Sequence, residues 1–273
     1  MMTIKQKNRL IFVLIFIAMA LLLTSITFFV LGLYTKTLAL PISLPQVSLP
    51  NLFLFRYNFF CPFIAVFTLL TYMIISLIIM NIEFEKTQSS EIIYLTIFFI
   101  GILPEAAKLI FPILNLWNSN QSIAIYATRF ILIGRMISVL SIFFASTCSK
   151  AEYRQFVERN IFIILAISFI FGLIYPVNTN VILPEGRFAW GMPVMFTTSY
   201  IAIFLLSFIS QIIYASRENS NYCLPFGLLL ISAGYYVLCG AWNFFAITTG
   251  FLSLAAGTIL YLGRLHHIFL WND

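Results

Sequence analysis

The chain carries no charge at all from Leu224 to Gly263, and this long apolar stretch places the strongest constraint on the fold. A single helix of these 40 residues would be about 60 Å long, twice the roughly 30 Å hydrocarbon core of a bilayer. We therefore predict two apolar helices with a hinge at residues 240–243, where Trp242 and Asn243 suit a membrane interface. This pattern is typical of a transmembrane helical hairpin.

Similar apolar runs fill most of the remaining chain. Hydrophobic residues make up 62% of the sequence and charged residues 9%, whereas a typical soluble domain has about 25% charged residues. We predict an all-α polytopic helical membrane bundle, organised as a single integral membrane domain over residues 1–273, with about eight transmembrane helices. The expected spans are approximately residues 10–34, 59–80, 91–115, 123–148, 161–176, 192–215, 224–240 and 243–263. The count is seven if the short fifth span does not cross.

The distribution of Lys and Arg predicts the orientation of the bundle. If the N-terminus is cytoplasmic, the outer segments hold Lys36, Arg56 and Arg187. The inner segments then hold the larger set, which is Lys5, Lys7, Arg9, Lys86, Lys150, Arg154, Arg159, Arg217 and Arg264. Cytoplasmic loops carry the excess of basic residues in membrane proteins. We therefore expect a cell-membrane protein whose two termini are both cytoplasmic.

The sequence does not favour nucleic-acid binding or metal binding. The net charge is +6, but the basic residues are scattered singly and form no stripe with interleaved aromatics. The four cysteines include no CxxC pair. His266 and His267 are adjacent, so on a helix they point about 100° apart, and no nearby Cys or Glu completes a zinc site. We expect no metal and no cofactor.

The third predicted span, Glu91–Asn115, carries charges near its middle. Glu105 and Lys108 share one helix face, and the residues around that face are apolar. An ionised side chain at this depth marks a functional site unless it is paired. Pro104 cannot donate a hydrogen bond to the Ile100 carbonyl, so we predict a helix kink that leaves this acceptor free.

The next span offers partners for these charges. Counting about 1.5 Å per residue from the outer ends places Glu105 in height between Arg129 and Arg135 of the antiparallel span. The four side chains Glu105, Lys108, Arg129 and Arg135 would then form a cluster of net charge +2. The two arginines differ by about 120° in direction, so both reach Glu105 only if their side chains bend.

Two interpretations of this cluster compete. In the first, Glu105 is a counter-ion that holds two helices together while the excess charge extends outward. In the second, the surplus positive charge receives a carboxylate or phosphate group of a solute in a cavity open to the outside. A third interpretation, a membrane enzyme with Glu105 as acid or base, is disfavoured because only one carboxylate lies deep in a span and the nearby cations should keep it ionised.

Two further patterns lie outside this cluster. Glu185, Arg187 and Trp190 in the second outer connection could contact a ligand from above, although a solvated turn with interfacial aromatics is the commoner arrangement. In the last span, a stripe of small residues predicts a close helix contact. This stripe consists of Gly250, Ser253 and Gly257.

The leading functional hypothesis is a transporter or membrane-embedded receptor for a small anionic solute, with its site between the third and fourth spans. The alternative is a non-catalytic membrane subunit or scaffold whose charges pair internally or with a helix of a partner membrane protein. In both cases the lipid bilayer is the expected surrounding. No sequence motif indicates an enzyme, and none identifies the solute.

Overall fold

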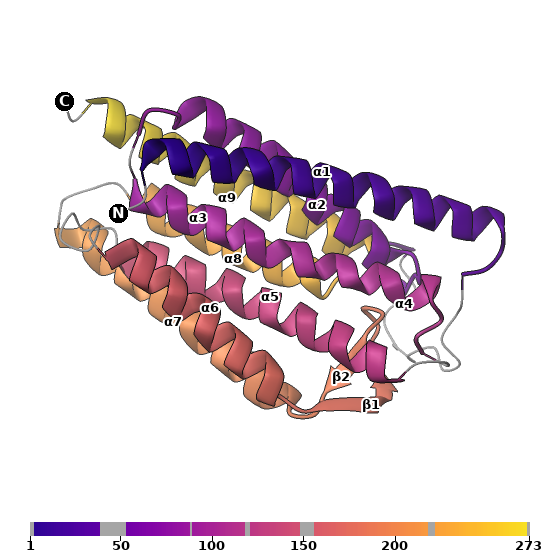
Figure 1. The fold of residues 1–273 in the computed structure, drawn as a ribbon. Helices are drawn as coiled ribbons and strands as arrows, with labels where there is room; N and C mark the ends of the chain where they lie inside the picture. Colours follow the sequence, from indigo (N-terminus) through magenta and orange to yellow (C-terminus); the bar gives the residue numbers. More distant parts are fainter. Residues whose placement is uncertain are drawn as a thin grey trace.

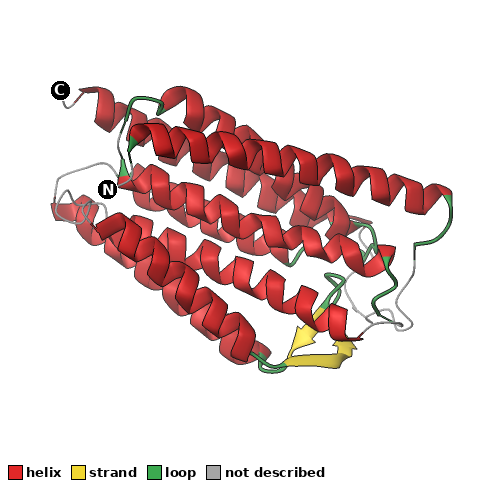
Figure 2. Cartoon of the chain, in the orientation of Figure 1, coloured by secondary structure: helices red, strands yellow, loops and turns green. Residues whose placement is uncertain are grey.

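The computed structural model describes residues 3–38, 53–87, 89–117, 121–147, 156–217 and 222–271. The described chain is almost entirely helical, with one short β-hairpin (Figure 2). In chain order, its elements are α1 (Ile4–Tyr34), η1 (Phe53–Phe55), α2 (Cys61–Glu83), α3 (Ser90–Ile102), η2 (Leu103–Leu109), α4 (Ile110–Ile113), α5 (Gln121–Thr147), α6 (Val157–Ile174), β1 (Val177–Ile182), β2 (Phe188–Trp190), α7 (Pro193–Arg217), α8 (Cys223–Cys239) and α9 (Phe244–Trp271).

Seven helical segments among the described residues are long and apolar enough to cross a membrane. They are α1, α2, the continuous α3–η2–α4 segment, α5, α6, α7 and α9. The fifth segment, α6, has 18 residues and meets this criterion. The short helix is instead α8, whose 17 residues rise about 26 Å, slightly less than the hydrocarbon core. α8 and α9 are separated by residues 240–243.

The helices run up and down in one bundle, and both termini lie at the same end (Figure 1). We call this the terminal end. There the Lys7 ammonium donates a hydrogen bond of 2.8 Å to the Thr87 carbonyl, which connects the start of α1 to the α2–α3 turn. The β1–β2 hairpin lies at the opposite end, which we call the hairpin end (Figure 1). The backbone of Asn58, just before α2, bonds the Trp242 carbonyl in the α8–α9 turn.

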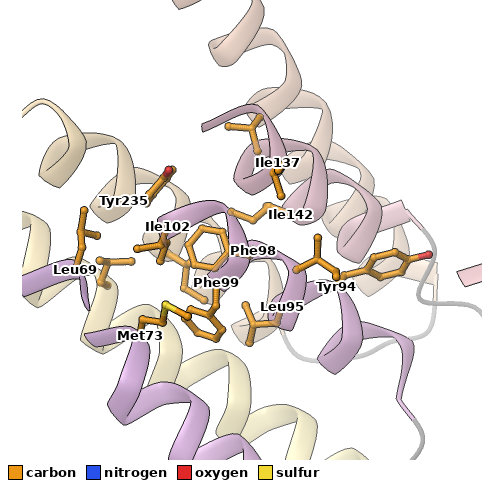
Figure 3. Packing of buried hydrophobic residues seen from close by; sticks show 14 of the residues in the cluster. Leu69, Met73, Tyr94, Leu95, Phe98, Phe99, Ile102, Ile137, Ile142 and Tyr235 are labelled. Atoms are coloured by element: carbon orange, nitrogen blue, oxygen red, sulfur yellow. The ribbon is translucent and has the colours of Figure 1, made fainter. Parts of the chain in front are cut away.

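α3 is the central helix of the bundle. All but one of its residues are buried, and its aromatic side chains contact several other helices (Figure 3). Phe98 packs edge-on against Tyr235 of α8, with ring centroids 5.3 Å apart, and Phe99 packs against Tyr72 of α2 at 5.9 Å. By contrast, α1 and the outer faces of α6 and α7 expose many large apolar side chains. Such a surface is typical of helices that face lipid.

α8 and α9 approach each other closely along small residues. A Cβ atom added at Gly250 would lie 2.7 Å from Leu238 Cγ, and one added at Gly257 would lie 2.7 Å from the Gly227 carbonyl oxygen. The hydroxyl of Ser253 donates to the Leu230 carbonyl at 2.9 Å. The predicted close helix contact is therefore confirmed, because side chains larger than these would separate the two backbones.

Candidate functional site

Pro104 changes the type of helix in the middle of the α3–α4 segment. The α-helix ends at Ile102, and the next seven residues, Leu103–Leu109, form a 3₁₀-helix. The Ile100 carbonyl accepts a hydrogen bond from the Leu103 amide. The prediction of a free acceptor at Ile100 is therefore wrong: the chain satisfies this group by tightening its turn, with a bond three residues ahead instead of four.

The 3₁₀ geometry aligns Glu105 with Lys108. With 3.0 residues per turn, side chains at positions i and i+3 lie directly above one another, whereas an α-helix would offset them by about 60°. Lys108 Nζ lies 2.8 Å from Glu105 Oε2, and both side chains are almost completely buried. The local helix type therefore lets both charged groups face the same neighbours.

Arg135 of α5 pairs with Glu105 across the α3–α5 contact. Its Nε lies 2.6 Å from Glu105 Oε1, and its Nη2 lies 3.3 Å from Oε2. Gly101 and Gly134 allow this approach, because a Cβ added at Gly101 would lie 2.6 Å from the Gly134 carbonyl oxygen. Close backbone packing places the guanidinium within reach of the carboxylate.

The β1–β2 hairpin carries a second carboxylate into this cluster. Glu185 Oε2 lies 2.7 Å from Arg135 Nη2 and 3.4 Å from Lys108 Nζ, and its Oε1 pairs with Arg187. Glu185 is 8% exposed and Arg187 is 1% exposed. The interpretation of this connection as a solvated turn is therefore wrong. The tip of the hairpin folds back into the mouth of the bundle.

The hairpin tip has a geometry that turns these side chains inward. The Leu183 amide donates to the Arg187 carbonyl at 2.8 Å, and the Gly186 amide donates to the Leu183 carbonyl at 2.9 Å. Gly186 has a φ of +82°, a conformation that glycine adopts without steric cost. Phe188 packs edge-on against Phe111 of α4, with centroids 5.9 Å apart. An apolar contact therefore anchors the hairpin beside its charged tip.

The C-terminus of α8 completes the cluster. The Cys239 carbonyl accepts hydrogen bonds from Lys108 Nζ at 2.6 Å and from Arg135 Nη2 at 2.8 Å. The last carbonyls of a helix lack partners within the helix and carry a partial negative charge, so buried cations stabilise them. These two hydrogen bonds connect the central α3–α5 pair to the α8–α9 helix pair.

Trp190 covers the arginines from the second strand of the hairpin. The guanidinium carbon of Arg187 lies 3.5 Å from the centre of the indole ring, and that of Arg135 lies 5.2 Å from it. Both contacts are within the range of favourable cation–π interactions. The indole also packs against Phe196 of α7, with centroids 4.1 Å apart. Trp190 therefore contacts both the charged cluster and α7.

The five charged side chains in contact carry a net positive charge. Arg135, Arg187 and Lys108 outnumber the carboxylates Glu105 and Glu185 by three to two, which gives a formal charge of +1. Burial alone would raise the pKa of the Glu185 carboxyl, but the three cations hold that pKa well below its ordinary value. Glu185 therefore remains ionised at neutral pH.

Arg129 does not join the ion pairs that the structure describes. Its backbone carbonyl oxygen would lie 3.4 Å from a Cβ added at Gly172 of α6, and its buried Nε has no hydrogen-bond partner among the described residues. Arg135, six positions later, faces α3 and the hairpin instead. The difference of about 120° between these positions on a helix accounts for their separate surroundings.

A cavity of about 630 Å³ adjoins the cluster at the hairpin end. It lies between the hairpin, the start of α7, the end of α8 and the start of α9, and its charged lining consists of Arg135, Glu185 and Arg187. Trp190, Phe196 and Tyr236 supply aromatic walls. Within the described part of the chain, the buried Nε of Arg187 and Nε1 of Trp190 have no hydrogen-bond partner.

Comparisons with known proteins give no further information on this site. No protein-family model matches the chain, and no curated protein or solved structure is significantly similar to it. Its chemistry must therefore be inferred from the residues present. Among the described residues, no group of three His, Cys, Asp or Glu side chains could hold a metal ion. Guanidinium groups can donate two parallel hydrogen bonds to a carboxylate or phosphate, and cavities with aromatic walls are typical of sites for organic molecules.

The sequence analysis placed Glu185 in a solvated turn, although the sequence contains an indication that this residue is buried. Of the nine acidic residues, Glu185 is the only one that the predicted topology places in an outer segment. If a carboxylate of an outer segment pairs with the surplus positive charge near Glu105, it must therefore be that of Glu185. The apolar residues around it, in the stretch from Val181 to Trp190, were a second indication that this connection is buried.

Proposed function

We propose that this chain is a multi-pass cell-membrane protein with eight spans and two cytoplasmic termini. Seven long apolar helices among the described residues support this proposal, and α8 would form the eighth span where the bilayer thins slightly around it. Both termini lie at the same end of the bundle (Figure 1), as an even number of spans requires. A reporter enzyme that is active only in the cytoplasm should therefore be active when it is fused to the C-terminus. Activity of a fused reporter that works only outside the cytoplasm would overturn this orientation.

We further propose that the protein binds a small anionic solute, as a transporter or a membrane-embedded receptor. One observation carries this proposal: a cavity of about 630 Å³ reaches Arg135 and Arg187, which belong to a cluster of net positive charge. A carboxylate or phosphate is recognised well by guanidinium groups because it can accept two parallel hydrogen bonds. The proposed site thus lies between the hairpin, α7 and α8, beside the contact of the third and fourth spans.

A second candidate function is a non-catalytic membrane subunit or scaffold. The Glu105–Arg135 ion pair favours it, because this pair is closed, with Nε and Oε1 2.6 Å apart, and Glu105 is 1% exposed. In this case the cluster would serve only to join α3, α5, α8 and the hairpin. Closed pairs of this kind also occur in proteins that bind ligands beside them, so the two functions must be separated by measurement.

Two substitutions at the hairpin tip separate them. Arg187→Gln reduces the formal charge of the cluster from +1 to 0, whereas Glu185→Gln raises it to +2. If the cavity binds anions, Arg187→Gln should weaken and Glu185→Gln should strengthen the binding of inorganic phosphate, acetate or benzoate to the purified full-length protein. Calorimetric titration measures both effects. A cluster that only joins helices would bind none of these anions in the wild-type protein, and this result would overturn the proposal.

A further inference from the structure

A second hollow continues from the charged cavity along the outside of the bundle. It has a volume of about 190 Å³ and lies between α7 and α8. Tyr236 and Val237 line both this hollow and the charged cavity. We call the second hollow the α7–α8 groove, and its lining residues are Tyr200, Ile201, Phe204, Ser232, Ala233, Tyr236 and Val237.

The groove differs from the cavity in chemistry. None of the described residues that line it is charged. The Ser232 hydroxyl donates to the Leu228 carbonyl of its own helix at 2.8 Å, so its one hydrogen-bond donor is already used. The rings of Tyr200 and Tyr236 lie 4.8 Å apart across the two helices. The polar cavity therefore adjoins an apolar groove.

The two hollows together form a path along two helices. On α7, Phe196 lines the charged cavity and Phe204 lines the groove. Gly240, which directly follows α8, lines the cavity, and Ser232 of α8 lines the groove. Each pair is eight positions apart, which corresponds to about 12 Å of helix rise. The path thus runs from the arginines at the hairpin end toward the middle of the bundle.

The groove also opens to the side of the bundle. Ile201 is 48% exposed, Tyr236 is 43% exposed and Val237 is 36% exposed. Helix surfaces on this side of α7 would face lipid in the proposed membrane orientation. A hydrocarbon chain could therefore enter the groove laterally, whereas a hydrophilic ion would gain nothing from it.

We propose that the ligand is a single-chain anionic lipid drawn from the bilayer. Its carboxylate or phosphate would lie in the charged cavity against Arg135 and Arg187, and its hydrocarbon chain would lie in the α7–α8 groove. This inference rests on the proposed anion-binding function and specifies the substrate class of the same site. Two features carry it: the positive charge at one end of the path and the apolar, laterally open groove at the other.

A series of n-alkyl phosphates from methyl to octyl tests the inference. Binding to the full-length protein in nanodiscs is measured below the micelle concentration, and empty nanodiscs give the background of lipid partitioning. Each methylene that enters the groove should increase the affinity about fourfold, the value for removing one CH₂ group from water. Alkyltrimethylammonium ions of the same chain lengths should not bind, because their head group is cationic.

Two matched variants locate the chain. Ala233→Phe fills the groove, whereas Ala202→Phe makes the same change at an exposed position of α7 outside it. Ala233→Phe should remove the dependence on chain length while keeping methyl phosphate binding, and Ala202→Phe should change neither. The smaller change Ala233→Val replaces Ala233→Phe if that variant does not fold.

The outcomes separate this inference from the function on which it rests. If methyl phosphate binds and chain length has the same effect in all variants, the lipid inference is wrong and anion binding stands. If neither methyl nor octyl phosphate binds to the wild-type protein, both proposals are wrong. Dependence on chain length that only the groove variant loses would support both.

Discussion

Arg135 Nη2 lies 2.7 Å from Glu185 Oε2, although the two residues are 50 positions apart in the sequence. The arginine belongs to a long helix and the glutamate to the tip of a hairpin. The same nitrogen also donates to the Cys239 carbonyl at the end of α8. One guanidinium therefore joins α5, the hairpin tip and the end of α8.

The first prediction concerns Glu185→Gln. Removing this charge leaves Arg135, Arg187 and Lys108 with one carboxylate among them, and breaking a buried ion pair costs about 3–5 kcal/mol. We expect unfolding in detergent to become easier by about 3 kcal/mol, the lower end of this range, since glutamine can still accept a hydrogen bond. Glu83→Gln, at an exposed position, is the control and should have little effect. Equal stability of the two variants would show that the hairpin is not held by this pair.

The second prediction concerns pH. The pKa of Glu185 is below its ordinary value of 4.5 in the folded protein. Protonation of the Glu185 carboxylate therefore destabilises the folded state relative to the unfolded state. Its contribution to stability is fully present above pH 4.5 and is lost as the pH falls toward the lowered folded-state pKa. We therefore expect the unfolding midpoint to fall on acidification below pH 4.5, and to fall less steeply in Glu185→Gln. Identical pH profiles for the two proteins would contradict the ion pairing.

The third prediction concerns the contact of α3 with α5. A Cβ atom added at Gly134 would lie 2.7 Å from the Gly101 carbonyl oxygen and 2.7 Å from Pro104 Cβ. Gly134→Ala should therefore destabilise the protein by about 1–3 kcal/mol, the usual effect of overpacking a core. It should also weaken anion binding, because Arg135 and Glu105 would move apart.

Gly263→Ala is the matched control for this substitution. In the described part of the chain, no neighbouring atom lies within 4 Å of a Cβ added at Gly263. In a helix, alanine is more stable than glycine by about 0.5–1 kcal/mol. The same chemical change should therefore have opposite signs at the two positions in a thermal unfolding experiment. Destabilisation of similar size at both glycines would argue against the close contact of α3 with α5.

The fourth prediction concerns the hairpin turn. Gly186 has a φ of +82°, and a Cβ added there would still be 3.8 Å from the nearest Phe63 ring atoms. Gly186→Ala should therefore act through backbone strain alone, at about 1–2 kcal/mol. Gly186→Asn should cost less, since asparagine tolerates this conformation better. A larger loss with asparagine than with alanine would indicate that side-chain size, and not strain, limits this position.

The helices could be predicted from the sequence, because a long apolar run in a membrane must satisfy its backbone groups internally. The 40-residue uncharged stretch is too long for one span, and the structure has two helices there, α8 and α9. The small-residue stripe of α9 also predicted a close helix contact, and in the structure α8 makes this contact. These features depend on local composition and length, which a single sequence contains.

The predicted site was less complete. Glu105, Lys108 and Arg135 lie together in the structure, but Arg129 faces another side of its helix. A depth argument fixes the height of a side chain and not its direction, so it could not choose between the two arginines. The 3₁₀ segment that contains Pro104 and aligns Glu105 with Lys108 has no clear signature in the sequence.

By itself, the sequence determined that this chain forms an apolar helical bundle with buried charges near Glu105. Only the tertiary structure decided which groups pair with those charges. Glu185 reaches Arg135 because the hairpin folds back into the mouth of the bundle, and the Cys239 carbonyl reaches Lys108 because α8 ends at that level. Apolar periodicity specifies which face of a helix is buried. The partner of a buried ion depends on the path of a distant loop, which only packing in three dimensions selects.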